Sequence, residues 1–367
     1  MADASAPLQS DAPQSAGGAA KVVVSIDAMG GDQGPSVVVK GLAKAAALYP
    51  DLEFILHGPA AELEQHVARR KITGVTTVRD AHGVVSMEDK PSYVMRHGKD
   101  TSMWSAIESV RSKEADVCVS CGNTGALMAV SMVRLRKLPG VNRPAIAILW
   151  PSDGPQGFNV LLDAGADIRA DESDLMQYAL MGASYARNGL DIARPRVGLL
   201  NVGTEEHKGR AELKFAAEMI QAQAEDGNFD FVGFVEGGQI ASDTVDVIVT
   251  DGFTGNVALK TGEGTASFIS ASLKDAFKHT PLSRLAALMA FTSLRRLRQR
   301  IDPRRVNGGV FLGLNGTVVK SHGSADATGV AAAIGLAYQL SKSGFSDRLA
   351  ARVAQAGGFA PPEGHDK

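Results

Sequence analysis

The sequence has little cysteine, almost no net charge and no long apolar run, and each shortage excludes a class of protein. Two cysteines, Cys118 and Cys121, cannot build a disulfide framework, so the reducing cytoplasm is the expected compartment. A net charge of −2 argues against a general nucleic-acid binder. No apolar stretch reaches the ~20 residues that a membrane-spanning helix needs, which argues against an integral membrane protein.

The chain also lacks a Pro/Gly/Ser linker inside residues 21–350, which indicates a single domain. Residues 1–20 are rich in Ala, Ser, Pro, Gln and Gly, without the positive start and apolar centre of a signal peptide. We predict a disordered tail there and a second tail over 351–367. Apolar residues make up 44% of the chain, enough for a sizeable core, so 21–350 is predicted to be one α/β domain.

What the chain does have is a repeated pattern, in which an apolar run ends in a short loop of Gly, Asn, Asp and Thr. The runs are Val22–Ile26, Val117–Ser120, Val160–Leu162, Val197–Leu200 and Val245–Val249. At least four of the loops lead into a stretch with helical periodicity. In a parallel sheet such loops emerge at the carboxyl edge, where ligands bind and helix N-termini offer N–H groups to anions. The pattern predicts an enzyme with one cleft lined by anion-binding turns.

Between Lys21 and about Asn256, strands and helices alternate, which predicts a parallel sheet covered on both faces. Two features interrupt it. A Gly/Pro turn over 150–158 separates two expected strands, and a later strand pair, Val310–Leu312 and Thr317–Lys320, is joined by a hairpin signal, Asn315-Gly316. Residues 257–303 are predicted to form a long helical excursion.

Asn123 and Thr124 follow a buried strand and can cap the next helix while facing a ligand. Capping alone explains them if the loop stands by itself, but related positions recur at Asn201 and Asn256. The acids Asp27, Asp32, Asp163 and Asp251 also lie at strand ends. They can either hold a divalent cation or orient loop N–H groups, and we favour orientation over a metal.

Several cations stand near these loops. Lys208 and Lys260 can reach an anion in the cleft, although surface lysines are usually only solvated. His322, directly after a strand, is the candidate for proton transfer. The remaining cations near the loops are Arg96, Lys99 and Arg210.

The two cysteines form a Cys-x-x-Cys without a second pair, so a zinc or redox role is disfavoured. Cys121 beside a helix N-terminus could be an acidified nucleophile, but a small buried filler is the favoured interpretation. Gly30-Gly31-x-x-Gly34 resembles a dinucleotide fingerprint only poorly, because Met29 stands where its first Gly belongs.

The helical excursion contains an apolar segment, Leu285–Phe291, followed by arginines. Seven arginines and one acid, Asp302, lie between Ser283 and Arg305. This composition suits a helix on an anionic membrane surface, while dimer packing or an acidic protein partner are the alternatives. The predicted membrane contacts are Leu285, Leu288, Phe291, Arg295 and Arg296.

Five motifs stand in order along the chain. They are Asp27–Asp32, Cys121–Ala126, Asn201–Glu205, Thr250–Asn256 and Lys320–Ser324. Over roughly residues 21–345 they resemble the bacterial phosphate acyltransferases of phospholipid synthesis, the acyl-[acyl-carrier-protein]:phosphate acyltransferases. Two positions depart from the pattern expected of that family: Cys121 in place of Ala, and Gly238-Gln239 in place of Arg-Asp.

The resemblance implies a Rossmann-like, three-layer α/β/α body akin to phosphotransacetylases and the isopropylmalate dehydrogenase group, usually as a homodimer. It implies reversible transfer of a long-chain fatty acyl group from acyl carrier protein to inorganic phosphate, without a cofactor or metal. The acyl phosphate would pass to a membrane-bound glycerol-phosphate acyltransferase. It also implies peripheral attachment to the inner face of the cell membrane through the helical excursion.

Phosphate is already a nucleophile, so we expect direct attack on the thioester without an acyl-enzyme, helped chiefly by positioning. Preorganised donors would stabilise the carbonyl oxygen. The expected catalytic residues are Asn123, Lys208 and Asn256. The expected phosphate- and substrate-binding residues are Asp27, Gly30, Gly31, Lys99, Gly122, Thr124, Asn201, Gly203, Asp251, Gly252, Gly255 and His322.

Three rival functions stay open at the level of sequence. A short-chain phosphotransacetylase using acyl-CoA would have no use for the apolar–arginine segment. A dehydrogenase is disfavoured by the poor glycine fingerprint. A non-catalytic, phosphate-sensing membrane scaffold would need no cleft of repeated loops.

Overall fold

A computed structural model of the chain describes residues 21–205, 208–301 and 308–356. The tail predicted over 1–20 lies outside these residues. In the described part, 11 strands form one mixed sheet in the order β3-β2-β1-β4-β11-β10-β5-β6-β9-β7-β8. The strands are β1 Val22–Asp27, β2 Leu52–Gly58, β3 Thr76–Asp80, β4 Val117–Ser120, β5 Ala145–Pro151, β6 Phe158–Leu162, β7 Arg196–Leu200, β8 Asp230–Val235, β9 Val247–Val249, β10 Gly309–Leu312 and β11 Thr317–Lys320.

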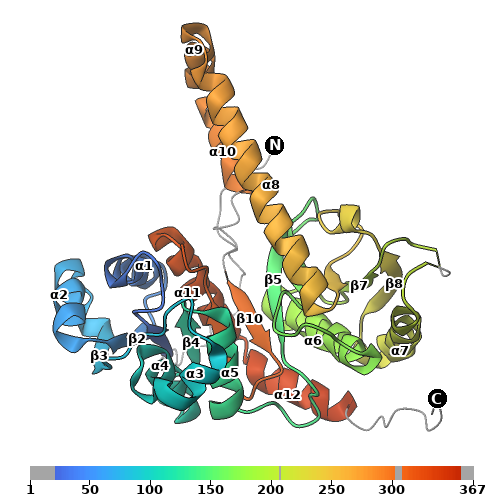
Figure 1. Ribbon diagram of the computed structural model, residues 1–367, viewed down its shortest axis with the longest axis horizontal. Coiled ribbons are helices and arrows are strands. Elements are labelled where there is room, and N and C mark those ends of the chain that lie inside the picture. Colours follow the sequence, from blue (N-terminus) through green and yellow to red (C-terminus); the bar gives the residue numbers. More distant parts are fainter. Residues whose placement is uncertain (1–20, 206–207, 302–307, 357–367) are drawn as a thin grey trace, which may run out of the picture.

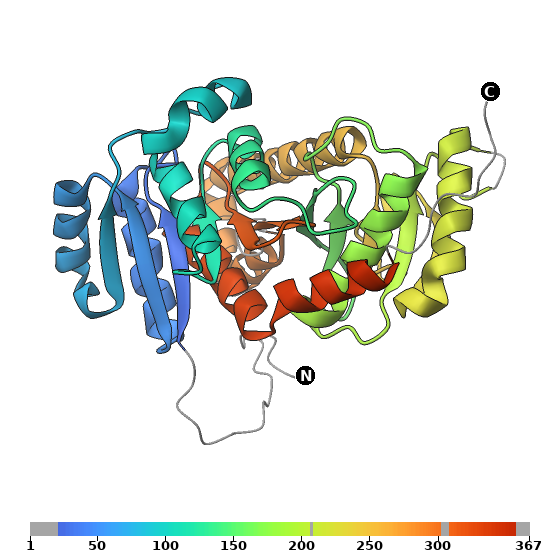
Figure 2. The same ribbon diagram turned by 90° about the horizontal axis from the view of Figure 1, so that it is seen from below.

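Helices cover both faces of this sheet (Figures 1 and 2). On one face, α1, α6 and α11 pack through residues such as Leu42, Tyr178 and Ile334, and on the other, α4 and α5 pack through Ile107 and Leu127. The α/β class and the three-layer arrangement are therefore confirmed. The helices are α1 Pro35–Leu48, α2 Ala60–Arg70, α3 Pro91–His97, α4 Ser102–Arg111, α5 Thr124–Arg134, α6 Glu172–Leu190, α7 Ala211–Gly227, α8 Gly252–Lys278, α9 Pro281–Met289, α10 Phe291–Ile301, α11 Ala327–Lys342 and α12 Phe345–Ala356.

The sheet reverses direction in its middle. β11 pairs with β4 in parallel, but β11–β10, β10–β5 and β5–β6 are all antiparallel. After three reversals, β6 and its parallel neighbours β9, β7 and β8 run opposite to β1, β2, β4 and β11. The carboxyl ends of β6, β7 and β9 therefore leave the sheet at the edge opposite to those of β1 and β4.

This reversal corrects one prediction. The five strand-to-helix loops exist, but they do not emerge at a single carboxyl edge. The cause is the pairing of β10 with β5, which joins the predicted hairpin β10–β11 to the antiparallel pair β5–β6 and so turns the second half of the sheet around.

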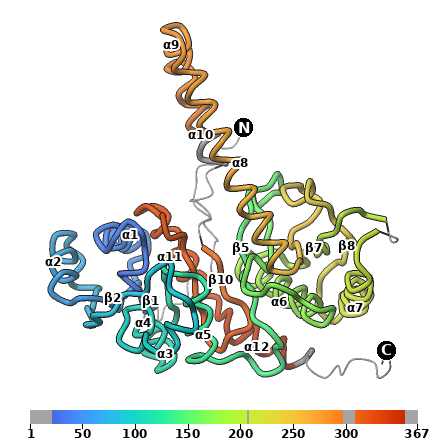
Figure 3. Tube along the Cα trace, viewed as in Figure 1, coloured from blue at the N-terminus to red at the C-terminus, as the bar shows by residue number. Residues whose placement is uncertain are grey.

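Helix α8 leaves the α/β body, and α9 and α10 fold back along it as a projecting hairpin (Figures 1 and 3). The helix begins at Gly252, and Ala258 and Leu259 still pack on the core, so the excursion starts inside the body rather than at 257. Beyond them lie exposed apolar side chains, including Phe268 and Leu288. Within the described ranges, no helix combines the length and apolar character needed to span a membrane.

The chain is helical past residue 350, where we expected the C-terminal tail to begin. Helix α12 extends to Ala356 because Leu349 and Val353 bury their side chains against the core. The predicted tail can therefore begin no earlier than 357, and 357–367 lie outside the described residues.

A buried histidine lies near the carboxyl end of β2. His57 Nε2 is 2.9 Å from Ser25 Oγ, and its Nδ1 is 2.8 Å from Ser105 Oγ. Burial, reinforced by the charge of Arg79, lowers the pKa of His57 to about 3, so the imidazole is neutral in the folded state at neutral pH.

This histidine should make the fold acid-sensitive. Between its unfolded pKa of about 6.5 and its folded pKa of about 3, the unfolded state binds the extra proton, so stability falls as pH falls. From about pH 7.5 to about pH 5, the loss due to His57 should be about 2 kcal/mol. Urea unfolding at both pH values should show that His57→Gln loses correspondingly less than wild type. An equal loss in both proteins would contradict the assignment.

Candidate active site

The carboxyl end of β1 holds a buried acid. Asp27 accepts hydrogen bonds from Ser102 Oγ at 2.6 Å and from Ser120 Oγ at 2.7 Å. Burial raises the pKa of Asp27, and these hydroxyl donors oppose that effect. The carboxyl group thus ties the start of α4 and the end of β4 to β1, as the orienting role predicted for it requires.

Three loops meet at this edge: 27–32, 120–125 and 320–324. The backbone N–H of Asp32 donates to Gly323 O at 2.9 Å, and that of Ser321 donates to Ser120 O at 2.9 Å. A Cβ on Gly30 would lie only 2.6 Å from the backbone nitrogen of Gly122. Here glycine allows one loop to approach another, rather than a ligand, closely.

Lys320, at the end of β11, is the residue that our sequence-based selection missed. Its ammonium group donates to Cys121 O at 3.4 Å and to Ser321 O. Burial lowers the pKa of Lys320 to about 8, while the Cys121 and Asp27 charges act in the opposite direction. Lys320 ends an apolar strand and begins the motif Lys320–Ser324, and this position could have identified it. We selected His322 from the same motif instead.

Asn123 acts as a structural connector. Its side-chain oxygen accepts from Ala126 N at 3.0 Å and caps α5, and its amide nitrogen donates to backbone oxygens of Met87 at 2.9 Å and Asp89 at 3.0 Å. Its amide hydrogens are already donated to the 86–89 segment. A catalytic role for Asn123, as the sequence predicts, would therefore require it to give up one of these hydrogen bonds when substrate binds. Gly122 is buried behind it, whereas Thr124 is exposed at the helix start.

Cys121 does not have the environment of an acidified thiol. It is buried, and burial raises its pKa, although Lys320 partly opposes the shift. The Cys121 side chain packs close to Gly31, since a Cβ on Gly31 would lie 3.3 Å from Cys121 Cβ. The position is that of a small buried filler.

His322 lies at the rim of the same edge. Its Nδ1 is 2.8 Å from Ser324 Oγ, and its Nε2 is 4.0 Å from Glu263 on α8. Burial lowers the pKa of His322. The ring is therefore mainly neutral at neutral pH.

A second group of predicted residues lies at the opposite edge. Asp163, after β6, accepts four backbone N–H groups, including those of Ile146 at 2.9 Å and Asp167 at 2.8 Å. Asp251 caps α8 by accepting from Thr254 N at 2.8 Å and pairs with Arg210 at 2.8 Å. Both acids orient loops, and in the parts of the chain described no cluster of three or more metal-ligating side chains occurs.

Glycines pack this second edge as well. A Cβ on Gly252 would collide with Asp163 Oδ2 and the backbone of Asp167, and one on Gly255 would collide with the backbone of Asp163. Asn256, one turn further, lies beside Gly165 with its side chain exposed. Its side chain forms no hydrogen bond to the described residues, which leaves the side-chain amide available.

The 201–209 loop is the third part of this edge. The buried amide of Asn201 donates to Gly203 O at 3.1 Å and to Lys208 O at 3.2 Å, so it shapes the loop. Lys208 is exposed and pairs with Glu205 at 2.8 Å. It is placed to reach an incoming anion only if that ion pair opens.

Helix α8 joins the two edges. Asn256 is in its second turn, beside Gly165, while Gly262 packs against Trp150 near the carboxyl end of β5. Lys260 and Glu263 pair at 2.8 Å, and the charge of Lys260 acts on Lys320. With a rise of about 1.5 Å per residue, Asn256 and Lys260 stand about 6 Å apart along the axis. The candidate site therefore extends along α8, with Lys320 and His322 at one end and Asn256 at the other.

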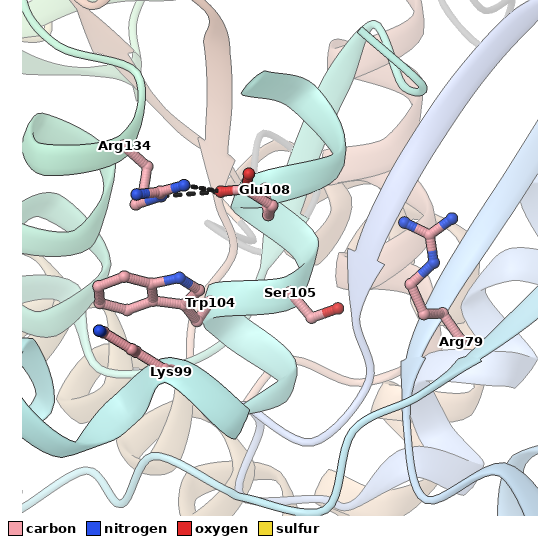
Figure 4. A pocket seen from close by; sticks show the side chains of 6 residues that line it. All are labelled: Arg79, Lys99, Trp104, Ser105, Glu108 and Arg134. Carbon is pink, nitrogen blue, oxygen red and sulfur yellow. Dashed lines mark hydrogen bonds and ion pairs between the residues drawn. The ribbon is translucent and has the colours of Figure 1, made fainter. Parts of the chain in front are cut away.

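Lys99 lines a different cavity, of about 430 Å³, with Arg79, Trp104, Ser105, Glu108 and Arg134 (Figure 4). Arg134 donates twice to Glu108 and stacks over Trp104, and Arg79 pairs with Glu114. Apart from Lys99, none of the residues predicted to bind phosphate lines this cavity. The structure therefore does not bring Lys99 together with the residues along α8.

The predicted membrane contacts lie on the projecting hairpin. Leu285, Leu288 and Phe291 are 55%, 72% and 59% exposed, and Arg295 and Arg296 are exposed beside them. Arg304 and Arg305, counted in the same segment, lie outside the described residues.

Comparison with known proteins agrees with this architecture. The family described as "Fatty acid synthesis protein" matches residues 22–348. A phosphate acyltransferase from Jannaschia sp. (strain CCS1) is 72% identical over 335 residues, covering 91% of this chain and 92% of the relative. One from Ruegeria sp. (strain TM1040) is 68% identical over 357 residues, covering 97% and 93%.

Solved structures show the same fold at low identity. A phosphotransacetylase from Streptococcus pyogenes superposes with a TM-score of 0.59 at 16% identity, covering 88% of this chain and 94% of that protein. A branched-chain phosphotransacylase from Enterococcus faecalis V583 gives 0.56 at 15% identity, covering 87% and 99%.

Proposed function

The chain belongs to the phosphate acyltransferase family, and we propose that it transfers a long-chain fatty acyl group from acyl carrier protein to inorganic phosphate. The observation that carries the proposal is the likeness to relatives of that name at 68–72% identity over more than nine-tenths of both chains. The chain is accordingly an acyltransferase of the fatty-acid synthesis family. The acyl-carrier-protein donor and the place in phospholipid synthesis are parts of the proposal.

The chemistry is an exchange at one carbonyl carbon. A phosphate oxygen attacks the thioester carbon, the C–S bond breaks, and the products are acyl phosphate and the carrier's thiolate. Phosphate is already nucleophilic, so correct placement supplies most of the help that the reaction needs. The same steps run backwards, so transfer is reversible, and no cofactor or metal takes part.

Lys320 and the start of α5 are the proposed phosphate cradle. The 120–125 and 27–32 loops shape it, with Gly30, Gly31 and Gly122 allowing their close packing. The Lys320 ammonium group, half-buried at the sheet edge, is a cation whose attraction for a dianion is weakly screened. Asn123 positions α5 in this scheme rather than touching the substrate.

Residues along α8 and at its base are proposed to serve the acyl thioester. Asn256, exposed and without a hydrogen bond inside the described chain, would donate to the carbonyl oxygen as it gains charge. Lys208 would approach the same region after leaving Glu205. Loss of one preorganised donor of this kind typically costs about 10²–10³ in rate.

Membrane attachment is proposed for the hairpin tip. Exposed Leu285, Leu288 and Phe291, with Arg295 and Arg296 beside them, match an apolar anchor flanked by cations. Such attachment, as a homodimer at the inner face of the cell membrane, would deliver acyl phosphate to a membrane-bound glycerol-phosphate acyltransferase.

The direct test is phosphate-dependent release of free thiol from palmitoyl-carrier protein, with palmitoyl-CoA and acetyl-CoA as alternative donors. We expect release only from the carrier protein and only with phosphate, and full turnover by Cys121→Ser, since no acyl-enzyme forms. Preference for acetyl-CoA would assign the short-chain phosphotransacetylase activity instead, and preference for palmitoyl-CoA would contradict the carrier protein as donor. No release from any donor would leave the non-catalytic scaffold.

Lys320 should control phosphate use and its pH dependence. Lys320→Met should lower kcat/KM for phosphate about 10- to 100-fold, the effect of losing a charged hydrogen bond. In wild type, kcat/KM should fall as pH rises through about 8, because the ammonium group loses its proton there. This alkaline decline should be absent from Lys320→Met and present at the same pH in Lys40→Met, which removes an exposed lysine of α1 outside the proposed site. A variant that keeps the decline would contradict the role.

The membrane proposal predicts that Leu288→Glu/Phe291→Glu no longer co-sediments with anionic liposomes. Burying each apolar side chain is worth about 1.5–3 kcal/mol, so losing both should weaken binding by about 10² or more. Ile168→Glu replaces an apolar residue on the α/β body that is more exposed still, at 80%, and should bind as wild type does. Unchanged binding by the double variant would refute the anchor.

A further inference from the structure

A second cavity lies between α6 and α12 and shares no lining residue with the proposed phosphate cradle. Figure 1 shows these two helices in the α/β body. The volume of the cavity is about 260 Å³. The residues that line it are Ser184, Arg187, Asn188, Arg348, Ala351 and Arg352. Three of the six are arginines and none is an acid.

Within the described part of the chain, the three guanidinium groups donate hydrogen bonds only to neutral acceptors. Arg187 donates to the backbone oxygens of Gly227 at 3.1 Å and Asn228 at 2.8 Å. Arg352 donates to Asp226 O at 2.7 Å, and Arg348 donates to the side-chain oxygen of Asn188 at 3.2 Å. Each bond holds a guanidinium group in place while leaving several of its five N–H donors unused.

These contacts differ from those of many other arginines in this protein. Arg143, Arg194 and Arg196, for example, each pair with aspartate at 2.6–2.8 Å. None of the three cavity arginines has a carboxylate partner among residues 21–205, 208–301 and 308–356. Burial lowers the pKa of Arg187, and the charge of Arg352 lowers it further, so the cavity concentrates positive charge.

We propose that this cavity binds a small phosphate anion, either inorganic phosphate or the phosphate group of a small monoester, at a site separate from the transfer site. Arginine matches phosphate oxygens with paired N–H donors and accepts such anions more readily than lysine does. The cavity is smaller than the ~300–1,000 Å³ typical of sites for drug-sized ligands, which favours a compact anion over a bulky cofactor.

A bound anion would connect three helices. Arg187 belongs to α6, Arg348 and Arg352 belong to α12, and the backbone acceptors of Arg187 and Arg352 lie at the end of α7. The anion would remove the repulsion between Arg187 and Arg352 and link α12 to α6. Binding therefore stabilises the C-terminal helix in its docked position.

The test counts bound phosphate on the full chain by equilibrium dialysis with radioactive inorganic phosphate at constant ionic strength. Arg348→Gln/Arg352→Gln should weaken one phosphate site about tenfold or more while leaving the KM for phosphate in the transfer assay unchanged. Arg111→Gln/Arg194→Gln, which removes two exposed arginines paired with carboxylates, is the matched control and should bind as wild type does.

A third variant tests whether the loss of phosphate binding is caused by misfolding rather than by loss of the site. Ala351→Glu keeps all three arginines and places a carboxylate on the exposed face of α12, where it would compete with the anion. It should lose the same phosphate site, and its thermal midpoint without phosphate should be no lower than that of wild type. Unchanged phosphate stoichiometry in both cavity variants, or an equal loss in the Arg111/Arg194 control, would overturn the proposal.

Competition distinguishes the two sources of the phosphate group. Displacement of the cavity-bound phosphate by glycerol 3-phosphate assigns the site to phosphate monoesters, and failure to displace it assigns the site to the inorganic ion. Because the transfer assay is measured separately, failure of the proposed acyl transfer would leave this result unaffected.

Discussion

Three consecutive antiparallel pairings, from β11 through β10 and β5 to β6, turn the second half of the sheet around, and the placement of every candidate residue depends on them. They separate the loops after β1 and β4 from those after β6, β7 and β9. A ligand can contact residues from both groups of loops only if one element of the fold runs from one edge of the sheet to the other. Helix α8 is that element, because it starts at Gly252, after its N-cap Asp251, and passes Lys320 and His322.

The same helix continues into the projecting hairpin, so the candidate site and the exposed apolar tip share one structural element (Figure 1). The body fixes its base, since Gly252 and Gly255 fit against Asp163 and Asp167 only without a side chain. Lys260 and Glu263 lie on the same helix, between this fixed base and the hairpin. Helix α8 therefore connects the residues of the proposed reaction to the segment of the proposed membrane attachment.

The strand-end acids and amides hold the loops. Asp27, Asp163 and Asn123 have their oxygens or amide hydrogens engaged by the protein itself, as buried polar groups generally must. Lys320 is also held by backbone oxygens, but it is a cation whose pKa burial lowers to about 8, and it lies where three loops meet. The three arginines between α6 and α12 form a separate positive site, held by backbone oxygens at the end of α7.

The sequence by itself determined the local structure. Apolar runs form buried strands, Asp251 caps α8, and Asn315-Gly316 lies in the turn between β10 and β11. These features depend on residues close together in the chain, so a local pattern is enough to predict them. The sequence also carried the five motifs of the family. Only the tertiary structure decided that Asn123 is occupied as a cap and tether, that Lys99 faces another cavity, and that Arg187 meets Arg348 and Arg352. Those facts depend on strand order and on contacts between residues far apart in sequence, which no local pattern encodes.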